Sequence, residues 1–426
     1  MKKVSVVTMG CSKNLVDSEV IMSVVQGDKY EITENAYESD IVIVNTCGFI
    51  ESAKDESVDA ILEATELKKS GKVEKVIVAG CLSGRYKEEL QREIPDVDVF
   101  LGPQDYSGVQ KALDLPERPF YRRILTTPSH FAYMKISEGC NNPCTFCAIP
   151  KMRGKHTSTP IRDLIIEAES LAEQGVKEII LLAQDSTMYG LDTHGEMILP
   201  QLIRDLNKVH GIEWYRLMYT YPAFYTDEVT HAIAESEKFA KYIDFPVQHV
   251  NDRILAKMQR NVTKDDLRKK INQMRSVMPE LTLRTTMITG FPSETEAEFQ
   301  EMLDFMEEMQ FDRLGAFSYS VEDHTKAARM EDQIPEEVRE ERRAAVMELQ
   351  TEISFQKNLD SIGKEFDVLI DDYNKESDVF IGRTYKDAPE IDNEVYVSGK
   401  DLEIGKFYKV EINDATEFDL YGSVKK

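Results

Sequence analysis

Three cysteines stand close together in the segment Gly139-Cys140-Asn141-Asn142-Pro143-Cys144-Thr145-Phe146-Cys147, with the spacing Cys-x3-Cys-x2-Cys. The two asparagines and the proline disfavour a helix, so we expect a loop. A structural zinc site takes four ligands, and an ordinary iron–sulfur cube takes four thiolates. Since no fourth cysteine follows within about thirty residues, the spacing indicates a cube with one iron left open to a small molecule. The alternative is a set of structural or zinc-binding thiols with His156 as fourth ligand.

The other three cysteines each follow an expected strand, and they stand about 35 residues apart. They are Cys11, Cys47 and Cys81, after strands expected at 3–8, 40–45 and 75–79. The carboxyl ends of parallel strands meet at one edge of a sheet, where ligands bind. A lone cysteine there is usually a small buried hydrophobe, but three at the same topological position indicate a second three-cysteine cluster. We expect the adjacent glycines, Gly10, Gly48 and Gly80, to let the backbone approach a bulky ligand.

Strands and amphipathic helices alternate over residues 1–115, which predicts a parallel sheet flanked by helices. A fourth strand is expected at 97–101, and helices are expected at 16–26, 52–69 and 84–93. Residues 114–130 contain three prolines with little periodicity and are expected to form a linker.

The alternation resumes from residue 131 and predicts six βα units, which fit a partial (β/α)6 barrel better than a closed eight-fold one. The strands are expected at 131–136, 178–183, 213–219, 242–247, 283–289 and 313–319. The three-cysteine loop follows the first of them, on the face where such barrels carry their chemistry.

A charged run with helical spacing at 335–358 predicts a connecting helix, and the tail is different. Short alternating strands are expected at 364–371, 378–384, 394–398, 407–415 and 418–424, as in a small β-barrel or OB-like module. We therefore expect three domains, at 1–115, 126–358 and 359–426.

The composition is that of a globular chain, with 426 residues, 42% hydrophobic and 30% charged. No apolar run is long enough for a membrane span, and we expect no signal peptide, hence a cytoplasmic protein with reduced cysteines. The net charge of −25 argues against a general nucleic-acid binder, which needs a basic face, and favours a basic partner.

The form Cys-x3-Cys-x-Phe-Cys resembles the radical S-adenosylmethionine (SAM) superfamily. The resemblance implies that Cys140, Cys144 and Cys147 hold a [4Fe-4S] cluster whose open iron binds SAM, with Phe146 close to the bound SAM. It also implies a 5′-deoxyadenosyl radical, chemistry that belongs to the cofactor while the protein positions it.

Two three-cysteine sites, a flavodoxin-like front, a radical-SAM barrel and a terminal β-barrel together resemble the methylthiotransferases over essentially the whole chain. The tail resembles the TRAM domain of that family. Members insert a methylthio group at an unactivated C–H bond. The resemblance implies a second [4Fe-4S] cluster at Cys11, Cys47 and Cys81 that takes part in sulfur delivery, with SAM supplying the methyl group and the radical.

Further family motifs are present. Ile149-Pro150-x-x-Arg153-Gly154 follows the cysteine loop, and the basic run that usually comes next is thinned to Lys155-His156-Thr157-Ser158-Thr159. The segment 181–185 resembles an Ala-Gln-Asp segment facing SAM, through Gln184; alternatively Asp185 only caps the next helix. The segment 286–294 resembles the adenine-contacting turn, through Ile288 and Gly290. Gln248 and His249 end another strand and receive no role. No catalytic residue is assigned beyond the cluster ligands.

Two branches of the family compete, one modifying an adenosine of tRNA and the other an aspartate of small-subunit ribosomal protein twelve. Ser12 and Lys13 match the second branch, as do acids in Tyr319-Ser320-Val321-Glu322-Asp323-His324-Thr325, although Asp323 and His324 depart from its Glu-Glu-Gly-Thr pattern. Residues 361–426 contain nine Lys and Arg against sixteen Asp and Glu, a net charge of −7. An acidic module suits a basic ribosomal protein better than tRNA.

The resemblance therefore implies methylthiolation of the β-carbon of that aspartate, with an electron donor such as flavodoxin or ferredoxin, and tRNA as partner only in the other branch. Two other classes stay open. One is a radical-SAM enzyme of another reaction type, whose second cluster only relays electrons. The other is a non-catalytic iron–sulfur or zinc scaffold.

Overall fold

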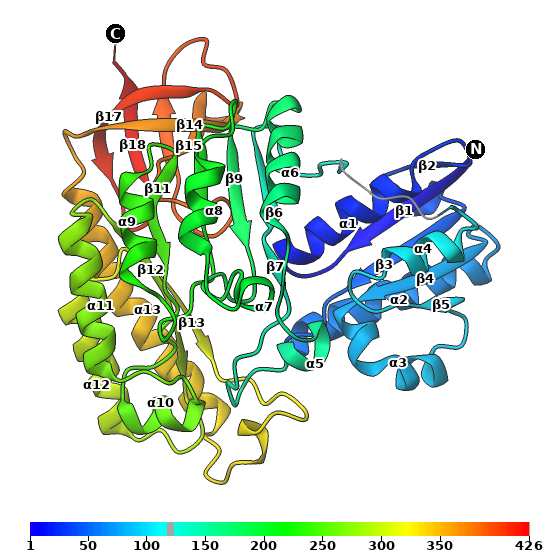
Figure 1. Cartoon of the computed structure of the whole chain (residues 1–426), viewed down its shortest axis with the longest axis horizontal. Coiled ribbons are helices and arrows are strands. Elements are labelled where there is room, and N and C mark those ends of the chain that lie inside the picture. Colours follow the sequence, from blue (N-terminus) through cyan, green and yellow to red (C-terminus); the bar gives the residue numbers. More distant parts are fainter. Residues whose placement is uncertain (117–122, 426) are drawn as a thin grey trace.

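The computed structural model describes residues 1–116 and 123–425, and the first part of the chain forms a five-stranded parallel sheet in the order β2-β1-β3-β4-β5 (Figure 1). Its elements are β1 (Lys2–Thr8), α1 (Ser12–Val25), β2 (Tyr30–Ile32), β3 (Ile41–Thr46), α2 (Glu51–Lys69), β4 (Lys75–Gly80), α3 (Cys81–Glu93), β5 (Val99–Phe100) and α4 (Tyr106–Ala112). This strand order is that of flavodoxin, so the predicted flavodoxin-like sheet is confirmed. Residues 117–122 of the predicted linker at 114–130, and residue 426, lie outside the described residues.

Two details of this sheet differ from the prediction. The edge strand β2 was not expected, since its three residues are only partly buried and show no apolar run. Helix α1 begins at Ser12, directly after Cys11, rather than at residue 16. Its first turn contains Lys13 and Asn14, polar side chains that are buried, and buried polar residues leave no trace in a hydrophobic pattern.

The central part is an open sheet of six parallel strands in the order β13-β12-β11-β10-β9-β6, which confirms the predicted partial barrel. Its strands are β6 (Phe131–Lys135), β9 (Glu178–Leu182), β10 (Trp214–Leu217), β11 (Phe239–Asp244), β12 (Thr282–Thr289) and β13 (Arg313–Ser318). Strand β11 begins three residues before the predicted 242–247, and Phe245-Pro246 follows it. Proline cannot donate a ladder hydrogen bond, which favours an end at this point.

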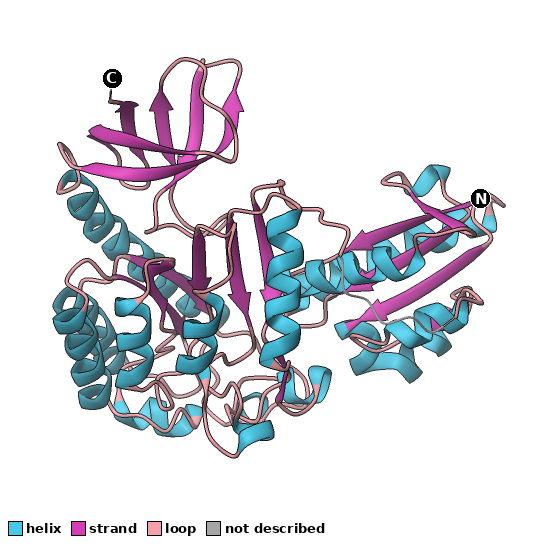
Figure 2. Cartoon of the chain, turned by 45° about the horizontal axis from the view of Figure 1, so that its top comes forward, coloured by secondary structure: helices cyan, strands magenta, loops and turns pink. Residues whose placement is uncertain are grey.

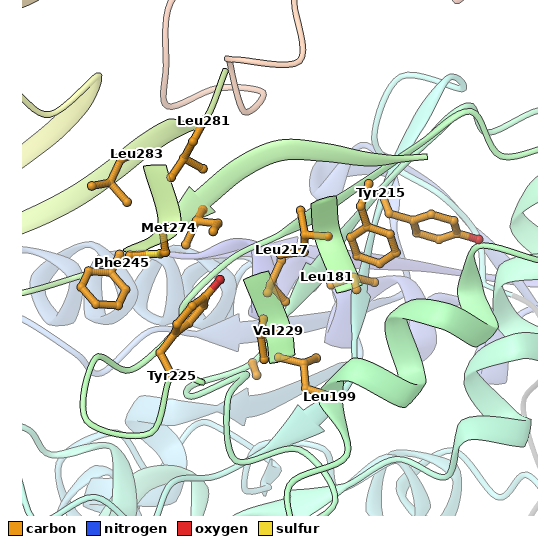
Figure 3. Close-up of a cluster of buried hydrophobic side chains, with 14 of the residues drawn as sticks. Leu181, Leu199, Tyr215, Leu217, Tyr225, Val229, Phe245, Met274, Leu281 and Leu283 are labelled. Atoms are coloured by element: carbon orange, nitrogen blue, oxygen red, sulfur yellow. The ribbon is translucent and has the colours of Figure 1, made fainter. Parts of the chain in front are cut away.

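Helices cover one face of the central sheet, and a short antiparallel pair, β7 (Ser137–Glu138) and β8 (Thr157–Ser158), flanks the cysteine loop. The helices of the central part are α5 (Ile149–Arg153), which lies beside α3, and α6 (Ile161–Glu173), α7 (Leu191–His194), α8 (Leu199–Leu206), α9 (Asp227–Glu235), α10 (Asp252–Met258), α11 (Lys264–Val277), α12 (Glu296–Met309) and α13 (Glu336–Leu359). Figure 3 shows part of the apolar layer between strands and helices, in which Leu181, Leu217 and Leu283 meet helix residues such as Leu199 and Val229. Within the described residues, no helix has both the length and the apolar character needed to cross a membrane.

The opposite face of the central sheet has its own small apolar layer. Tyr133, Ile180 and Tyr242 from three strands pack there with Val16 of α1 and Ala388 of the tail. Both outer parts of the chain therefore contribute to covering the inner face of the partial barrel.

The tail forms a closed five-stranded barrel in the order β14-β15-β16-β18-β17, which confirms the predicted small β-barrel. Its strands are β14 (Glu365–Asn374), β15 (Val379–Arg383), β16 (Val395–Ser398), β17 (Phe407–Ala415) and β18 (Leu420–Val424). Figure 2 shows the barrel at one end of the central sheet, beyond the amino ends of its strands, with α13 leading to it.

Buried charges join the tail barrel to the amino ends of the central strands. Glu178, the first residue of β9, accepts hydrogen bonds from Arg216 Nε (2.9 Å) and from Arg383 of the barrel (2.7 Å). Arg383 also binds Asp371 through two nitrogens (2.7 and 2.9 Å). Because Glu178 is fully buried, its negative charge needs cationic partners to offset the loss of hydration.

Other acids of the tail are used in the same contact. Asp387 pairs with Arg313, Asp392 accepts from Tyr242 and pairs with Arg284, and Glu390 accepts from Tyr133. Part of the tail's negative charge therefore faces the central sheet and is neutralised there, so that it is not available to a basic partner.

Arg383→Ala is expected to weaken the docking of the barrel, because it leaves the buried Glu178 and Asp371 each with one cationic partner fewer. Removing one member of a buried pair costs on the order of 3–5 kcal/mol, so calorimetry should show a lower unfolding temperature. The matched control is Lys409→Ala, which breaks an exposed pair with Asp367 and should change the temperature little. Equal effects of the two substitutions would contradict this account of the joint.

Candidate functional site

The N-terminal thiol set, Cys11, Cys47 and Cys81, lies at the carboxyl ends of three neighbouring strands. Cys11 precedes α1, Cys47 follows β3, and Cys81 is the first residue of α3 after β4. Burial raises the pKa of the Cys47 thiol, and the nearby Cys11 raises it further. Burial raises the pKa of Cys81 to about 11, with Arg153 lowering it and Cys11 and Cys47 raising it. Because β1, β3 and β4 are adjacent in the sheet, the fold brings the three cysteines to one edge of it.

The glycines beside these cysteines serve a different purpose from the one expected. A Cβ at Gly10, where φ is +84°, would lie 2.6 Å from Cys47 Cβ. A Cβ at Gly48 would lie 2.8 Å from the Leu82 Cα atom, and one at Gly80 would lie 2.5 Å from the Thr46 carbonyl oxygen. The glycines therefore let the cysteine-bearing loops approach one another. That they also let the backbone approach a bulky ligand stays a prediction.

Asn14 joins two of these loops and was missed by the sequence analysis. Its side-chain nitrogen donates to the carbonyl oxygens of Met9 (2.8 Å) and Thr46 (2.9 Å), and its side chain is fully buried. The residue was present in the Gly-Cys-Ser-Lys-Asn segment, but only the fold reveals that a buried amide connects β1 to β3 there.

The loop thiol set, Cys140, Cys144 and Cys147, lines a cavity of about 380 Å³. The backbone N–H groups of Asn142 and Ile149 donate to the sulfurs of Cys140 and Cys147, each at 3.4 Å. Burial, with a smaller contribution from the neighbouring thiol of Cys144, raises the pKa of Cys140 to about 11 and that of Cys147 to about 12. The three sulfurs thus share one wall of a cavity and are supplied with hydrogen-bond donors.

Cys144 has two side-chain neighbours that the sequence did not single out. The Tyr221 hydroxyl and an Arg260 terminal nitrogen each lie 3.6 Å from its sulfur. The Arg260 guanidinium stacks over the Tyr221 ring at 4.1 Å, and its Nε atom is buried without a hydrogen-bond partner among the described residues.

Both thiol sets fit an iron–sulfur cluster by the chemistry of their donors. Each is made of three thiols, and N–H donors reach the sulfurs, which is a common feature around such clusters. In the described part of the chain, no three or more His, Cys, Asp or Glu side chains are arranged to hold one metal ion. His156, the proposed fourth zinc ligand, instead places Nε2 3.1 Å from the Ser158 hydroxyl and 3.9 Å from Asp192.

The four residues expected to contact SAM are only partly brought together. Phe146 and Ile288 pack in one apolar group with Phe291 and Tyr319. Gln184 donates to Glu138 at 2.5 Å, and its carbonyl oxygen is buried without a hydrogen-bond partner in the described residues.

Gly290, with φ of +70°, faces α13, since a Cβ there would lie 2.1 Å from the Arg339 Cγ atom. Its N–H donates to both carboxylate oxygens of Glu294 at 3.1 Å. Glu294 also pairs with Arg342, and its carboxylate lies 3.3 Å from His249 Nε2. Gly290 and His249 therefore hold the turn between β12 and α12 in place.

Asp185 does not cap the next helix, because α7 begins at Leu191 after Gly190. Its buried carboxylate instead accepts hydrogen bonds from Asn142 Nδ2 (2.7 Å) and from the Thr187 N–H (2.9 Å). Asp185 thus holds the cysteine loop from the end of β9, through a contact that no local pattern encodes.

Four largely buried charged side chains lie between the two thiol sets. They are Asp17, Lys135, Glu138 and Arg153, and we call them the inter-sheet ion network. Arg153 donates to Asp17 (3.2 Å) and to Glu138 (3.0 Å), and Lys135 pairs with the same two carboxylates. Burial alone would raise the pKa of Glu138, but Lys135 and Arg153 hold it at about 2. Glu138 and Arg153 flank the loop thiol set in sequence, whereas Asp17 belongs to α1.

Arg153 also reaches the other thiol set directly. Its Nε atom donates to the Cys81 sulfur at 3.2 Å, and a terminal nitrogen donates to Asn14 Oδ1 at 2.5 Å. Cys81 packs there against Ala148 and Met152, and Figure 1 shows α5 beside α3 at this junction.

The segment 319–325 forms a second bridge between the sheets. Glu322 is buried and pairs with Arg85 (3.1 Å) and Lys54 (3.5 Å) of the N-terminal part. His324 adopts a φ of +63°, a conformation suited to the glycine that stands there in the family pattern, and it lines the cavity of the loop thiol set.

Comparison with known proteins gives three family models along the chain. Residues 3–102 match "Uncharacterized protein family UPF0004", residues 134–306 match the "Radical SAM superfamily" and residues 362–424 match the "TRAM domain". The chain is 47% identical over 430 residues to a protein of Cytophaga hutchinsonii named ribosomal protein uS12 methylthiotransferase RimO, covering 100% of this chain and 98% of the relative. A protein of the same name from Clostridioides difficile is 46% identical, covering 100% and 99%.

Solved structures share the fold at low sequence identity. The radical SAM methyltransferase TsrM from Kitasatospora setae superposes with a TM-score of 0.55 at 13% identity, covering 74% of this chain and 73% of that one. The cobalamin-dependent radical SAM enzyme OxsB gives a TM-score of 0.53 at 13% identity, covering 77% and 54%. These likenesses support the fold alone.

Gly10→Ala is expected to displace Cys47, because the added Cβ would overlap it, and so to lower the iron bound per chain after anaerobic reconstitution. The control is Gly71→Ala, which imposes the same unfavourable positive φ (+75°) with no atom within 4 Å of the added Cβ. Iron content is measured against protein concentration. Equal iron losses in both variants would show that backbone strain, and not the contact with Cys47, is responsible.

Proposed function

We infer the reaction from the family, because this chain belongs to the RimO family of ribosomal protein uS12 methylthiotransferases. It is a radical-SAM enzyme that methylthiolates ribosomal protein uS12 and uses SAM with iron–sulfur chemistry. The relatives named above modify a ribosomal protein, which favours this function over the alternative in which tRNA is the substrate.

We propose that the methylthio group is placed on the β-carbon of one aspartate of uS12, and that two [4Fe-4S] clusters take part. The loop thiol set would hold the cluster that binds SAM, and the N-terminal thiol set would hold the cluster of the sulfur-delivery site. The observation that carries the proposal is the pair of three-thiol sets, each at the carboxyl ends of a parallel sheet and joined by one ion network. Together with SAM, such clusters supply the radical and sulfur-transfer chemistry.

Residues of the chain itself position the loop thiol set and would contact SAM at this site. Asn142 and Ile149 donate N–H groups to loop-set sulfurs, while Asp185 fixes the loop itself. We propose Phe146, Gln184 and Ile288 as SAM-contacting residues, with Gln184 supported by its buried unpaired carbonyl oxygen and the other two by their shared apolar group. Gly290 is proposed to shape the adenine turn through its positive φ. Holding the reactants in a fixed geometry is worth several orders of magnitude in rate.

The partners and boundaries follow from the same proposal. A basic ribosomal protein suits an acidic chain, and a flavodoxin or ferredoxin would supply electrons. We propose that the enzyme acts in the cytoplasm, where its substrate is made, and that its domains span 1–115, 126–358 and 359–426. The three family models support three domains, because each match falls within one of these ranges.

Deletion of the gene in its host should remove a methylthio increment from one aspartate of uS12, as measured by mass spectrometry of digested ribosomal proteins. The control is the profile of modified tRNA nucleosides from the same cells, which should stay unchanged. Loss of a methylthioadenosine with intact uS12 would reverse the assignment of substrate.

Cys144→Ala is expected to abolish SAM cleavage, whereas Cys47→Ala should spare cleavage and stop methylthiolation. Each variant should bind about four irons per chain, against about eight in the wild type, because each loses one cube. SAM cleavage is followed by chromatography of 5′-deoxyadenosine and the product by mass spectrometry. Intact methylthiolation by Cys47→Ala would refute the sulfur-delivery site, and an iron-free wild type would leave only a zinc or structural role.

A further inference from the structure

Within the described residues, Arg153 is the one member of the inter-sheet ion network whose side chain donates to a thiol of the N-terminal set. It ends α5, the helix that begins two residues after Cys147, and its side chain is 4% exposed. The backbone of Arg153 therefore lies close in sequence to the loop thiol set, while its guanidinium contacts the Cys81 sulfur of the N-terminal set.

The orientation of this guanidinium is fixed on all sides. Its terminal nitrogens donate to Asp17, Glu138 and Asn14, so that Nε is left to face the Cys81 sulfur. Asn14 also holds the loops that follow β1 and β3, which places Arg153 in the framework of the whole N-terminal set. Arginine suits such a site because its planar fork can satisfy several acceptors at once while keeping its charge.

A positive N–H donor on a ligand sulfur has a known electrostatic effect. Hydrogen bonds to the sulfurs and the local charge both tune the reduction potential of iron–sulfur clusters. Reduction adds one negative charge to a cluster, so a nearby guanidinium stabilises the reduced form more than the oxidised form. The effect is strong where water is excluded, as it is at this buried contact.

We propose that Arg153 is a positioning residue for the sulfur-delivery site, which fixes the Cys81 sulfur relative to the SAM-binding loop and makes the N-terminal cluster easier to reduce. This rests on the proposed function, which assigns a cluster to Cys11, Cys47 and Cys81. The two sites are thereby linked through one side chain. A substitution of Arg153, which belongs to the central domain, changes the reduction potential of the cluster in the N-terminal domain.

The test is a redox titration of the reconstituted enzyme followed by electron paramagnetic resonance. Addition of SAM changes the signal of the cluster that binds it, so the signal insensitive to SAM reports the N-terminal cluster. Arg153→Gln should shift the midpoint potential of the SAM-insensitive signal to a more negative value and leave the SAM-responsive one in place. Arg153→Lys, which keeps the charge without the fork, should give a smaller shift in the same direction.

Arg85→Gln is the matched control, because Arg85 is equally buried, also bridges the two sheets through Glu322, and donates to no sulfur in the described part of the chain. Arg85 donates to the Gly48 carbonyl oxygen beside Cys47, so Arg85→Gln should lower thermal stability and shift the SAM-insensitive potential less than Arg153→Gln does. An unshifted SAM-insensitive signal in Arg153→Gln would refute the proposal, as would a shift equal to that in Arg85→Gln. A wild-type enzyme with no SAM-insensitive cluster signal would instead refute the proposed second cluster.

Discussion

Two carboxylates and two cations, buried between two parallel sheets, set the geometry on which the rest of the molecule depends. Asp17, Lys135, Glu138 and Arg153 neutralise one another, and removal of these charges from water is offset only when all four are in place. Such a network therefore favours one mutual position of the sheets over small displacements. In this position the carboxyl ends of both sheets, and with them both thiol sets, lie on either side of Arg153.

A second network of buried ion pairs lies at the opposite end of the central sheet. There Glu178, Arg216 and Arg383 join the tail barrel to the amino ends of the strands. Charge in this protein thus has two separate uses. Buried pairs align the three parts of the chain, whereas the remaining excess of acids determines how the surface attracts a basic partner. Net charge counted along a segment combines the two, which is why the −7 of the tail overstates what a partner would encounter.

Much of the fold could be predicted because apolar runs mark the strands of both parallel sheets, and parallel topology then gathers the residues that follow each strand. That is sufficient to bring Cys11, Cys47 and Cys81 to one edge. It does not reveal buried polar side chains, whose partners are distant in sequence. Asn14, Asp185 and Arg153 were all within segments of interest, but their roles depend on partners 15 to 139 residues away along the chain. The sequence likewise does not reveal that Gly10, Gly48 and Gly80 make room for neighbouring loops, because a missing Cβ can make room for a loop as well as for a ligand.

The position of the tail barrel has a consequence for the size of anything the enzyme acts upon. The barrel sits at the amino ends of the central strands, and the cysteine loop lies beyond their carboxyl ends. The central strands have four to eight residues and are roughly 13–26 Å long. A molecule held by the barrel while its target atom lies at the loop must reach across that length. A free amino acid is too small to do so, and an extended peptide needs roughly eight residues to cover the longest strand, whereas a folded protein, or one already mounted in a larger particle, has the necessary span.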